Sequence, residues 1–115
     1  MPHRLEQVNE LIRQQLNQLL LTKVDFPPDC LTTIVKVETS PDLRHAKIFI
    51  SVLPNDQEKK VLVILKHHVG LLQFELNKKL AFRPLPRIRF LIDETEKKAA
   101  DLEALLNKIK EEIEN

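Results

Sequence analysis

The stretch TTIVKVETSPDLRHAKIFISVL, residues 32–53, decides the fold because it holds two strand-like segments separated by a short turn. From Thr32 to Glu38 the residues are mainly β-branched and alternate in character, which is typical of a strand. Ser40-Pro41-Asp42-Leu43 is typical of a turn. Apolar residues at every second position from Ala46 to Val52 predict a second strand. The two segments therefore predict an antiparallel β-hairpin.

An amphipathic helix is predicted before the hairpin, from about His3 to Leu21. Its apolar residues recur at spacings of three and four, so that they share one face of a helix; they are Leu5, Val8, Ile12, Leu16 and Leu19. Pro27 and Pro28 then predict a turn. A helix is therefore expected to lead into the hairpin.

A second helix is predicted after the hairpin, from about Lys59 to Phe82, and it contains the one glycine of the chain. Asn55 and Glu58 resemble a capping box at its start. A glycine inside a helix costs about 1 kcal/mol relative to alanine and usually marks a kink, a cap or a close contact. The segment His68-Val69-Gly70 is therefore predicted to be a kink between two shorter helices.

The last third of the chain predicts one strand and one helix. Pro84 and Pro86 prevent the second helix from continuing, and the alternation from Arg87 to Ile92 predicts a third strand. A helical crossover favours a third strand parallel to the second, which then lies in the centre of the sheet. Residues 94–115 predict a C-terminal amphipathic helix, packed on the domain or mobile, and Asp93 suits its start. The order of elements predicts an α+β fold with a three-stranded mixed sheet.

Composition limits the class of protein. The chain has 115 residues, of which 43% are hydrophobic and 30% charged, and this fits one globular domain. Its apolar runs are too short to span a membrane, so a cytoplasmic protein is expected. The single cysteine, Cys30, cannot form an internal disulfide. One glycine cannot build a phosphate-cradling loop, so that class of nucleotide chemistry is excluded.

Charge is distributed unevenly, although the net charge is only +1. Residues 1–92 hold 14 Lys and Arg against 9 Asp and Glu, giving +5, and residues 93–115 hold 4 against 8, giving −4. No acidic residue lies between Lys78 and Ile92. Cations that neutralise phosphates release counterions, so this segment predicts an RNA contact. Its cations are Lys78, Lys79, Arg83, Arg87 and Arg89, and further candidates for an RNA or ribosome contact are Arg4, Arg13 and Lys47.

The same cations fit a purely structural interpretation. Lys78 and Lys79 suit the negative end of a helix dipole, and arginines on an exposed strand protect an edge. Phe49 faces the more open side of the predicted sheet and is a candidate for stacking on a base, although packing over the sheet is the simpler role. His67 and His68 have no histidine or acidic residue four places away, so no metal site is expected.

Several stretches resemble the bacterial ribosome-binding factor A family, in the same order along the chain from about Arg4 to Leu106. The hairpin TSPDLRHAKIFISVL, residues 39–53, is the most similar, and Asp25-Phe26-Pro27 resembles the turn after the first helix. Gly70 falls at the helix break of the family, and the third-strand segment is matched at Arg83, Pro86, Ile88, Phe90 and Asp93. Two positions depart from the family pattern. His68 replaces a small residue of an Ala-x-Gly kink, and Gln73 stands where the family often has arginine.

The resemblance implies a type II KH-like fold over residues 1–93, with the order α-β-β-α-(kink)-α-β, followed by the C-terminal helix. It implies a ribosome-binding factor that associates with the free 30S subunit and assists late maturation, 16S rRNA processing and cold adaptation. The implied partners are the small subunit, its 16S rRNA and a release GTPase. The chain is expected to be a monomer that binds no cofactor and no membrane and catalyses no reaction.

Two other classes of function remain open. One is a protein-interaction module that uses the apolar face of the C-terminal helix, formed by Leu102, Leu105, Leu106, Ile109 and Ile113. The other is a small α+β enzyme, which would need a pocket with convergent polar groups.

Overall fold

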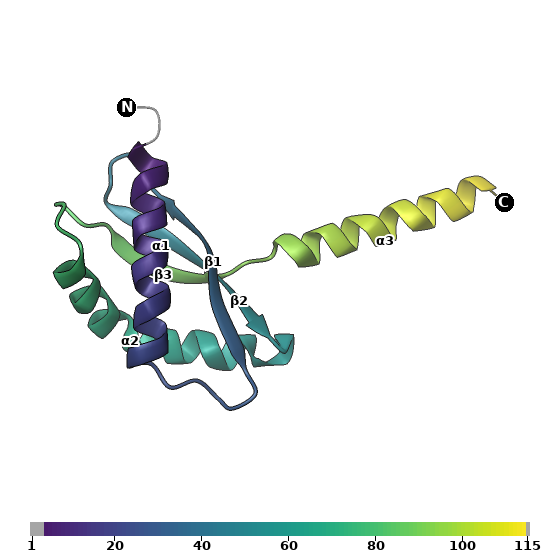
Figure 1. Cartoon of the computed structure of the whole chain (residues 1–115). Coiled ribbons are helices and arrows are strands. Elements are labelled where there is room, and N and C mark those ends of the chain that lie inside the picture. The colour runs from purple at the N-terminus through teal and green to yellow at the C-terminus, as the bar shows by residue number, and fades with distance from the viewer. Residues whose placement is uncertain (1–3, 115) are drawn as a thin grey trace.

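The computed structural model describes residues 4–114 and has the predicted α+β architecture. Its elements are α1 (Arg4–Lys23), β1 (Leu31–Thr39), β2 (His45–Leu53), the 3₁₀ turn η1 (Asn55–Gln57), α2 (Glu58–Lys79), β3 (Arg87–Ile92) and α3 (Thr95–Glu114). Figure 1 shows α1 and α2 gathered around the sheet, while α3 projects away as a separate rod. The radius of gyration is 17.5 Å, against about 13 Å for a compact domain of this length, because α3 extends so far. His3, where the first helix was expected to begin, lies outside the described residues.

The sheet has the order β1-β2-β3, as the sequence predicts. β1 and β2 form an antiparallel hairpin, and β3 pairs parallel to β2, which is central. Within the turn, Ser40 Oγ donates a hydrogen bond to Asp42 Oδ1, and the Arg44 amide donates to the same oxygen at 3.1 Å. The bond from Ser40 lowers the pKa of the Asp42 carboxyl group. These contacts stabilise the turn and thereby the register of the hairpin, because Asp42 bonds to residues on both sides of it in the loop.

Only one face of the sheet is buried. Alternate residues of β2, from Ala46 to Val52, and Ile88 and Phe90 of β3 lie in a single core with α1 and α2. At β1 the alternation changes side, because a bulge between Ile34 and Lys36 shifts the register. Ile34 is 1% exposed and Val35 is 42% exposed, so the continuous alternation predicted for this strand is wrong at the bulge.

Amide side chains from the two helices cover both edges of the sheet. On β1, Asn17 Oδ1 accepts from the Ile34 amide at 3.1 Å and Asn9 Oδ1 accepts from the Thr39 amide at 2.9 Å. On β3, Gln73 Oε1 accepts from the Ile88 amide at 2.9 Å. Backbone groups of an edge strand are otherwise free to pair with another chain. Two amides of β1 and one of β3 are therefore occupied by helix side chains, which attach both edge strands to the helices.

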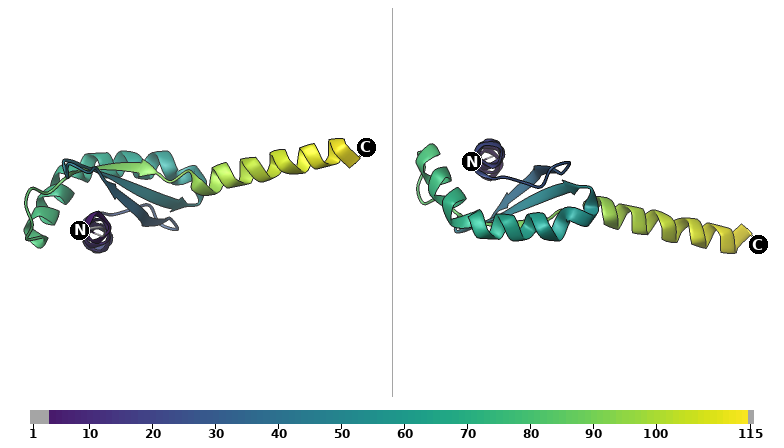
Figure 2. Two further views of the ribbon diagram at one scale, coloured as in Figure 1. Left: turned by 90° about the horizontal axis from the view of Figure 1, so that it is seen from above. Right: turned by 90° about the horizontal axis from the view of Figure 1, so that it is seen from below.

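Helix α2 is one continuous α-helix and not two helices separated at Gly70. It bends near its middle, so that its two halves run in different directions (Figure 2). It ends at Lys79, three residues before the predicted Phe82, and no side chain caps its start, so the predicted capping box is wrong. The turn η1 occupies the place of that cap.

Candidate nucleic-acid interface

The open face of the sheet carries a cluster of basic side chains. In the strand register, Lys47 lies beside Arg89 and His45 lies beside Arg87. These positions alternate with the buried residues of β2 and β3, so their side chains leave the sheet on the side opposite the core. We call this cluster the basic sheet face: His45, Lys47, Arg87 and Arg89, all of them exposed.

The charges of the basic sheet face are not neutralised by any residue that the structure describes. Within residues 4–114, Lys47, Arg87 and Arg89 form no ion pair. The nearest acidic neighbour in the register, Glu38 opposite Lys47, is paired instead with Lys36 at 3.0 Å. Three permanent positive charges on two adjacent strands create a local positive potential, which attracts a polyanion.

Phe49 lies on the same face but is not a free stacking surface. Its ring is half-buried, and the Lys36 ammonium lies 4.7 Å from the ring centroid. The ion pair with Glu38 holds that ammonium in place. A base could stack on Phe49 only after Lys36 moved, so the packing role that the sequence favours describes the geometry better.

Arg83, a predicted RNA contact, is directed at the protein's own backbone. Its guanidinium donates to the carbonyls of Leu80, Phe82 and Asn77 at 2.7, 2.8 and 2.7 Å. The last carbonyls of a helix lack partners within the helix and carry partial negative charge. Arg83 therefore caps the end of α2 and is much less available to phosphate than the sequence suggested.

The remaining predicted cations lie on the helices. Lys78 pairs with Glu75 at 3.8 Å and lies 4.6 Å from the Phe74 ring centroid, while Lys79 is exposed. The cations of the predicted RNA-contacting segment therefore do not form one surface, because α2 packs on the buried face of the sheet and Arg87 and Arg89 leave the other face. On α1, Arg4 is exposed, and Arg13 is hydrogen-bonded to Glu10, which raises the pKa of Arg13.

The predicted kink residues have separate roles. His68 Nδ1 is hydrogen-bonded to the Ile64 carbonyl, one turn earlier in α2, at 2.8 Å, and Val69 packs against the core. A Cβ on Gly70 would meet nothing within 4 Å, and the glycine has no positive φ. Neither internal packing nor backbone conformation therefore requires a glycine at position 70.

Gln73 occupies the position where an arginine contact was expected. Its amide nitrogen donates to the Pro86 carbonyl and to Asn77, both at 3.1 Å, and its oxygen accepts from the Ile88 amide. The side chain joins α2 to the first residues of β3, so it positions Arg87 and Arg89 without reaching the open face. Sequence reasoning missed this role of Gln73, and it also missed His45. His45 lies two residues before Lys47, so a strand at this position would have placed both side chains on the same face.

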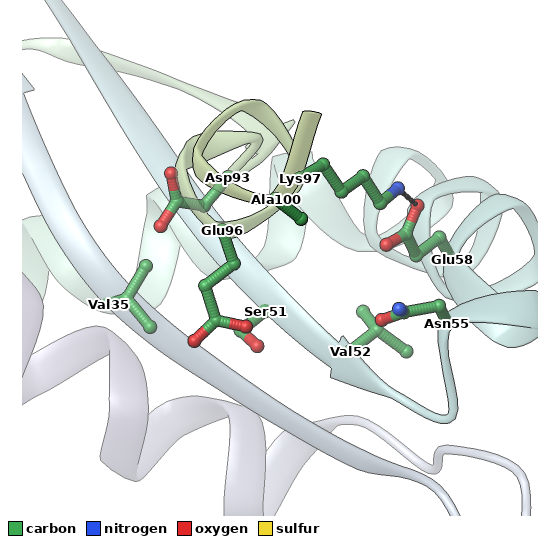
Figure 3. Close-up of a pocket in the computed structure, with 9 residues that line it drawn as sticks. All are labelled: Val35, Ser51, Val52, Asn55, Glu58, Asp93, Glu96, Lys97 and Ala100. Atoms are coloured by element: carbon green, nitrogen blue, oxygen red, sulfur yellow. Dashed lines mark hydrogen bonds and ion pairs between the residues drawn. The ribbon is translucent and has the colours of Figure 1, made fainter. Parts of the chain in front are cut away.

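A pocket of about 280 Å³ lies where α3 leaves the sheet (Figure 3). Of its carboxylates, Glu58 is paired with Lys97 at 2.6 Å and Asp93 accepts from Thr95. Both carboxylates therefore stabilise the start of α3. Glu96 is the third carboxylate that lines the pocket. Among the described residues, no group of three side chains could hold a metal ion. The pocket is best interpreted as a structural junction.

Comparison with known proteins identifies the family. A sequence model described as ribosome-binding factor A matches residues 4–106. The chain belongs to the ribosome-binding factor A family. Ribosome-binding factor A of Thermodesulfovibrio yellowstonii is 32% identical over 111 residues, which cover 96% of this chain and 94% of that relative.

Solved structures of the family share the fold. The crystal structure of ribosome-binding factor A from Thermus thermophilus covers 76% of this chain and 94% of its own, with a TM-score of 0.63 and 22% identity. A homology model of the Thermus thermophilus factor, fitted into a cryo-electron microscopy map of its 30S complex, covers 73% and 93%, with a TM-score of 0.57 and 23% identity. The KH-like α+β fold expected from the sequence is thereby confirmed. In addition, no helix within residues 4–114 is long and apolar enough to cross a membrane.

Proposed function

We propose that this chain binds the small ribosomal subunit and that the basic sheet face is its contact with 16S rRNA. The observation that carries the proposal is the presence of Lys47, Arg87 and Arg89, exposed and without ion pairs among the described residues, on the one open face of the sheet. Family membership supports the same partner, since a relative from Thermus thermophilus is described in a 30S complex. The other predicted cations, Lys78, Lys79 and Arg4, would add weaker contacts from the helices.

The proposed mechanism is selection of one subunit conformation. A protein that binds one arrangement of a precursor more tightly than the others shifts the population toward it, by as much as the difference in affinity allows. The sheet supports this role because the pairing of β2 with β3 sets the backbone positions of the basic residues, and helix side chains attach both edge strands to the core. The proposal includes late subunit maturation, 16S rRNA processing and cold adaptation in the cytoplasm, with a GTPase as the release partner.

The test is a charge reversal confined to β3. The double variant Arg87→Glu, Arg89→Glu should abolish cosedimentation with purified small subunits while circular dichroism and the melting temperature stay close to the wild type. In binding titrations at several salt concentrations, the plot of log affinity against log salt concentration should also become less steep, by about one to two in slope, because two phosphate contacts are lost. Arg83 is left unchanged in this design, because reversing it would disturb the end of α2.

The matched control is Lys59→Glu, Lys60→Glu at the exposed start of α2, which changes the net charge equally. It should retain binding, since acidic residues suit a helix N-terminus and these positions lie away from the basic sheet face. Unchanged cosedimentation of the β3 variant, or equal loss in both variants, would show that the sheet face is not the contact.

A further inference from the structure

Another pocket lies at the end of the basic sheet face, between the β1–β2 turn and the segment that leads into β3. Its volume is about 330 Å³, at the lower end of the range for pockets that hold small ligands. Two half-buried leucines and three exposed basic side chains contribute to it. We call it the turn pocket, and its lining residues are Leu43, Arg44, His45, Pro84, Leu85 and Arg87.

Hydrogen bonds hold both sides of the turn pocket in place. The Arg87 amide donates to the Arg44 carbonyl at 2.9 Å, which joins the turn to the first residue of β3. On the β3 side, the Pro86 carbonyl accepts from Gln73 of α2 at 3.1 Å. On the turn side, Asp42 accepts the two hydrogen bonds described above. The pocket is therefore formed before any ligand binds, and little ordering of the chain opposes binding.

Leu43 has an unusual backbone conformation for a leucine. Its φ is 61°, in the left-handed region, where a bulky side chain is strained and glycine or asparagine is usual. The side chain does not belong to the hydrophobic core of the described residues, and it lines the turn pocket instead. Strained residues of this kind cluster at ligand-binding sites. A ligand in the pocket therefore supplies a reason for a leucine that neither the turn nor the core requires.

The exposed part of the turn pocket is positively charged. Within residues 4–114, Arg44 and Arg87 form no ion pair, and none of the residues that line the pocket is acidic. Asp42, the nearest carboxylate along the chain, is hydrogen-bonded to Ser40. The ligand that fits this pocket therefore has a negative charge for the arginines and an apolar surface for the leucines.

A nucleotide combines these two properties, because it has a flat base and a charged phosphate. Arginine and histidine side chains stack on bases, and a guanidinium group also binds phosphate through two hydrogen bonds. We propose that the turn pocket holds one unstacked nucleotide of the rRNA. Its base lies against Leu43 and Leu85, and its phosphate is bound by Arg44 and Arg87. His45 borders the base from the strand side.

The position of the turn pocket favours a nucleotide within an RNA strand over a free one. Arg87 belongs to both the pocket and the basic sheet face, and Arg89 follows on the same side of β3. A strand with one base in the pocket therefore places its neighbouring phosphates over the sheet face. Bases inside a duplex are stacked and paired, so only an unpaired segment reaches the pocket. The inference rests on the proposed function and narrows its target to unpaired rRNA.

Binding of short RNAs to the full chain tests the turn pocket. Leu43→Asn should weaken binding of a single-stranded uridine hexamer about fivefold to tenfold, because the apolar contact with the base is lost. Asparagine suits the left-handed backbone, so the melting temperature should stay the same or rise. Affinity for a blunt RNA duplex, which contacts only the basic sheet face, should not change. Leu21→Asn, at an exposed leucine of α1, is the matched control and should bind both RNAs like the wild type.

Salt dependence separates the apolar contact from the ionic one. For the hexamer, Arg44→Ala should make the plot of log affinity against log salt concentration less steep by about 0.7, the value for one phosphate contact with a single strand. Leu43→Asn should leave this slope unchanged, because it removes no charge. Lys23→Ala, at an exposed cation of α1, is the control for Arg44→Ala and should also leave the slope unchanged.

Three results would overturn the turn pocket as an RNA site. The first is hexamer binding that is absent in the wild type or equally tight in Leu43→Asn. The second is an equal loss of hexamer and duplex binding in Leu43→Asn, which would place the effect on the basic sheet face. The third is uridine monophosphate bound as tightly as the hexamer, which would make the pocket a site for free nucleotides. None of them overturns the proposed function, which is tested separately by cosedimentation of the Arg87→Glu, Arg89→Glu variant.

Discussion

Helices α1 and α3 have the same length, 20 residues, and both carry an apolar stripe, yet one is buried and the other is not. Five residues of α1 lie in the core, whereas no described residue of α3 does: the α1 residues are Val8, Ile12, Leu16, Leu19 and Leu20. The difference lies in the connections. A loop at residues 24–30 lets α1 turn back onto β1, where Asn9 and Asn17 bond to the strand edge. The two-residue connection before α3 directs it away. An amphipathic pattern thus fixes the face of a helix but not its partner.

The largest expected effect is the contrast between equivalent leucines of the two helices. Leu16→Ala should lower the free energy of unfolding by about 2–5 kcal/mol, because Leu16 is fully buried and its truncation leaves a cavity. Leu106→Ala should change it by less than about 0.5 kcal/mol at low protein concentration. Urea denaturation of both variants measures the contrast. A loss of similar size in Leu106→Ala would mean that α3 packs on the core domain in solution.

The second effect concerns how the sheet edges are held. Gln73→Ala should destabilise the fold by about 1–3 kcal/mol, because the Ile88 amide and the Pro86 carbonyl both lose their side-chain partner. Gln18→Ala, at an exposed position of α1, is the control and should be close to neutral. In thermal unfolding, equal melting temperatures for the two variants would show that water replaces Gln73 at no cost.

The hairpin, the central position of β2 and the parallel β3 could be predicted from sequence because each depends on local alternation and on chain connectivity. The bulge at Val35 could not, since β-branched residues on both sides of it give the same signal whichever way they face. Asp93 was expected at the start of α3 from its capping chemistry; its carboxylate does accept hydrogen bonds from Thr95, and the helix itself begins at Thr95. The direction of α3 could not be predicted, because it depends on contacts between distant residues that the pattern of apolar residues along the sequence does not reveal.

The candidate site was predicted in part. Arg87, Arg89 and Lys47 were candidates from the sequence; the register places Lys47 beside Arg89 and adds His45, which was not a candidate. Arg83 has the same charge and lies in the same basic segment, but the chain reverses after α2 and turns its guanidinium onto carbonyl groups. Charge composition therefore located the cations, whereas only the fold showed which of them are free to meet phosphate.

The third prediction concerns the glycine of α2. Gly70→Ala should stabilise the domain by up to about 1 kcal/mol, because the position is helical and open and alanine restricts the unfolded chain. Chemical denaturation measures the gain, and Val63→Ala, at an exposed position of the same helix, reports the ordinary effect of alanine there. Destabilisation by Gly70→Ala would show that the bend of α2 itself depends on the glycine.

The smallest expected effect is a pH dependence at the start of α3. The hydrogen bond from Thr95 lowers the pKa of the Asp93 carboxyl group below its usual 3.8. A depressed folded-state pKa means that the stabilisation is complete above the unfolded value and is lost as pH falls through the folded value. The side chain is largely solvated, so the loss of stabilisation should be only about 0.3–0.5 kcal/mol. We expect it as fraying of the first turn of α3.

The titration of Asp93 is measured by NMR as the shift of the Thr95 amide resonance from about pH 5 to about pH 2. This local signal separates it from the titrations of Glu10 and Asp42, whose pKa values are also lowered. Asp93→Asn is the matched control, because asparagine still caps a helix but does not titrate. The wild-type resonance should shift with a midpoint below 3.8 and the variant resonance should not. A midpoint at or above 3.8 would mean that the Asp93 contact does not hold the base of α3, and the helix would then be free to take other directions.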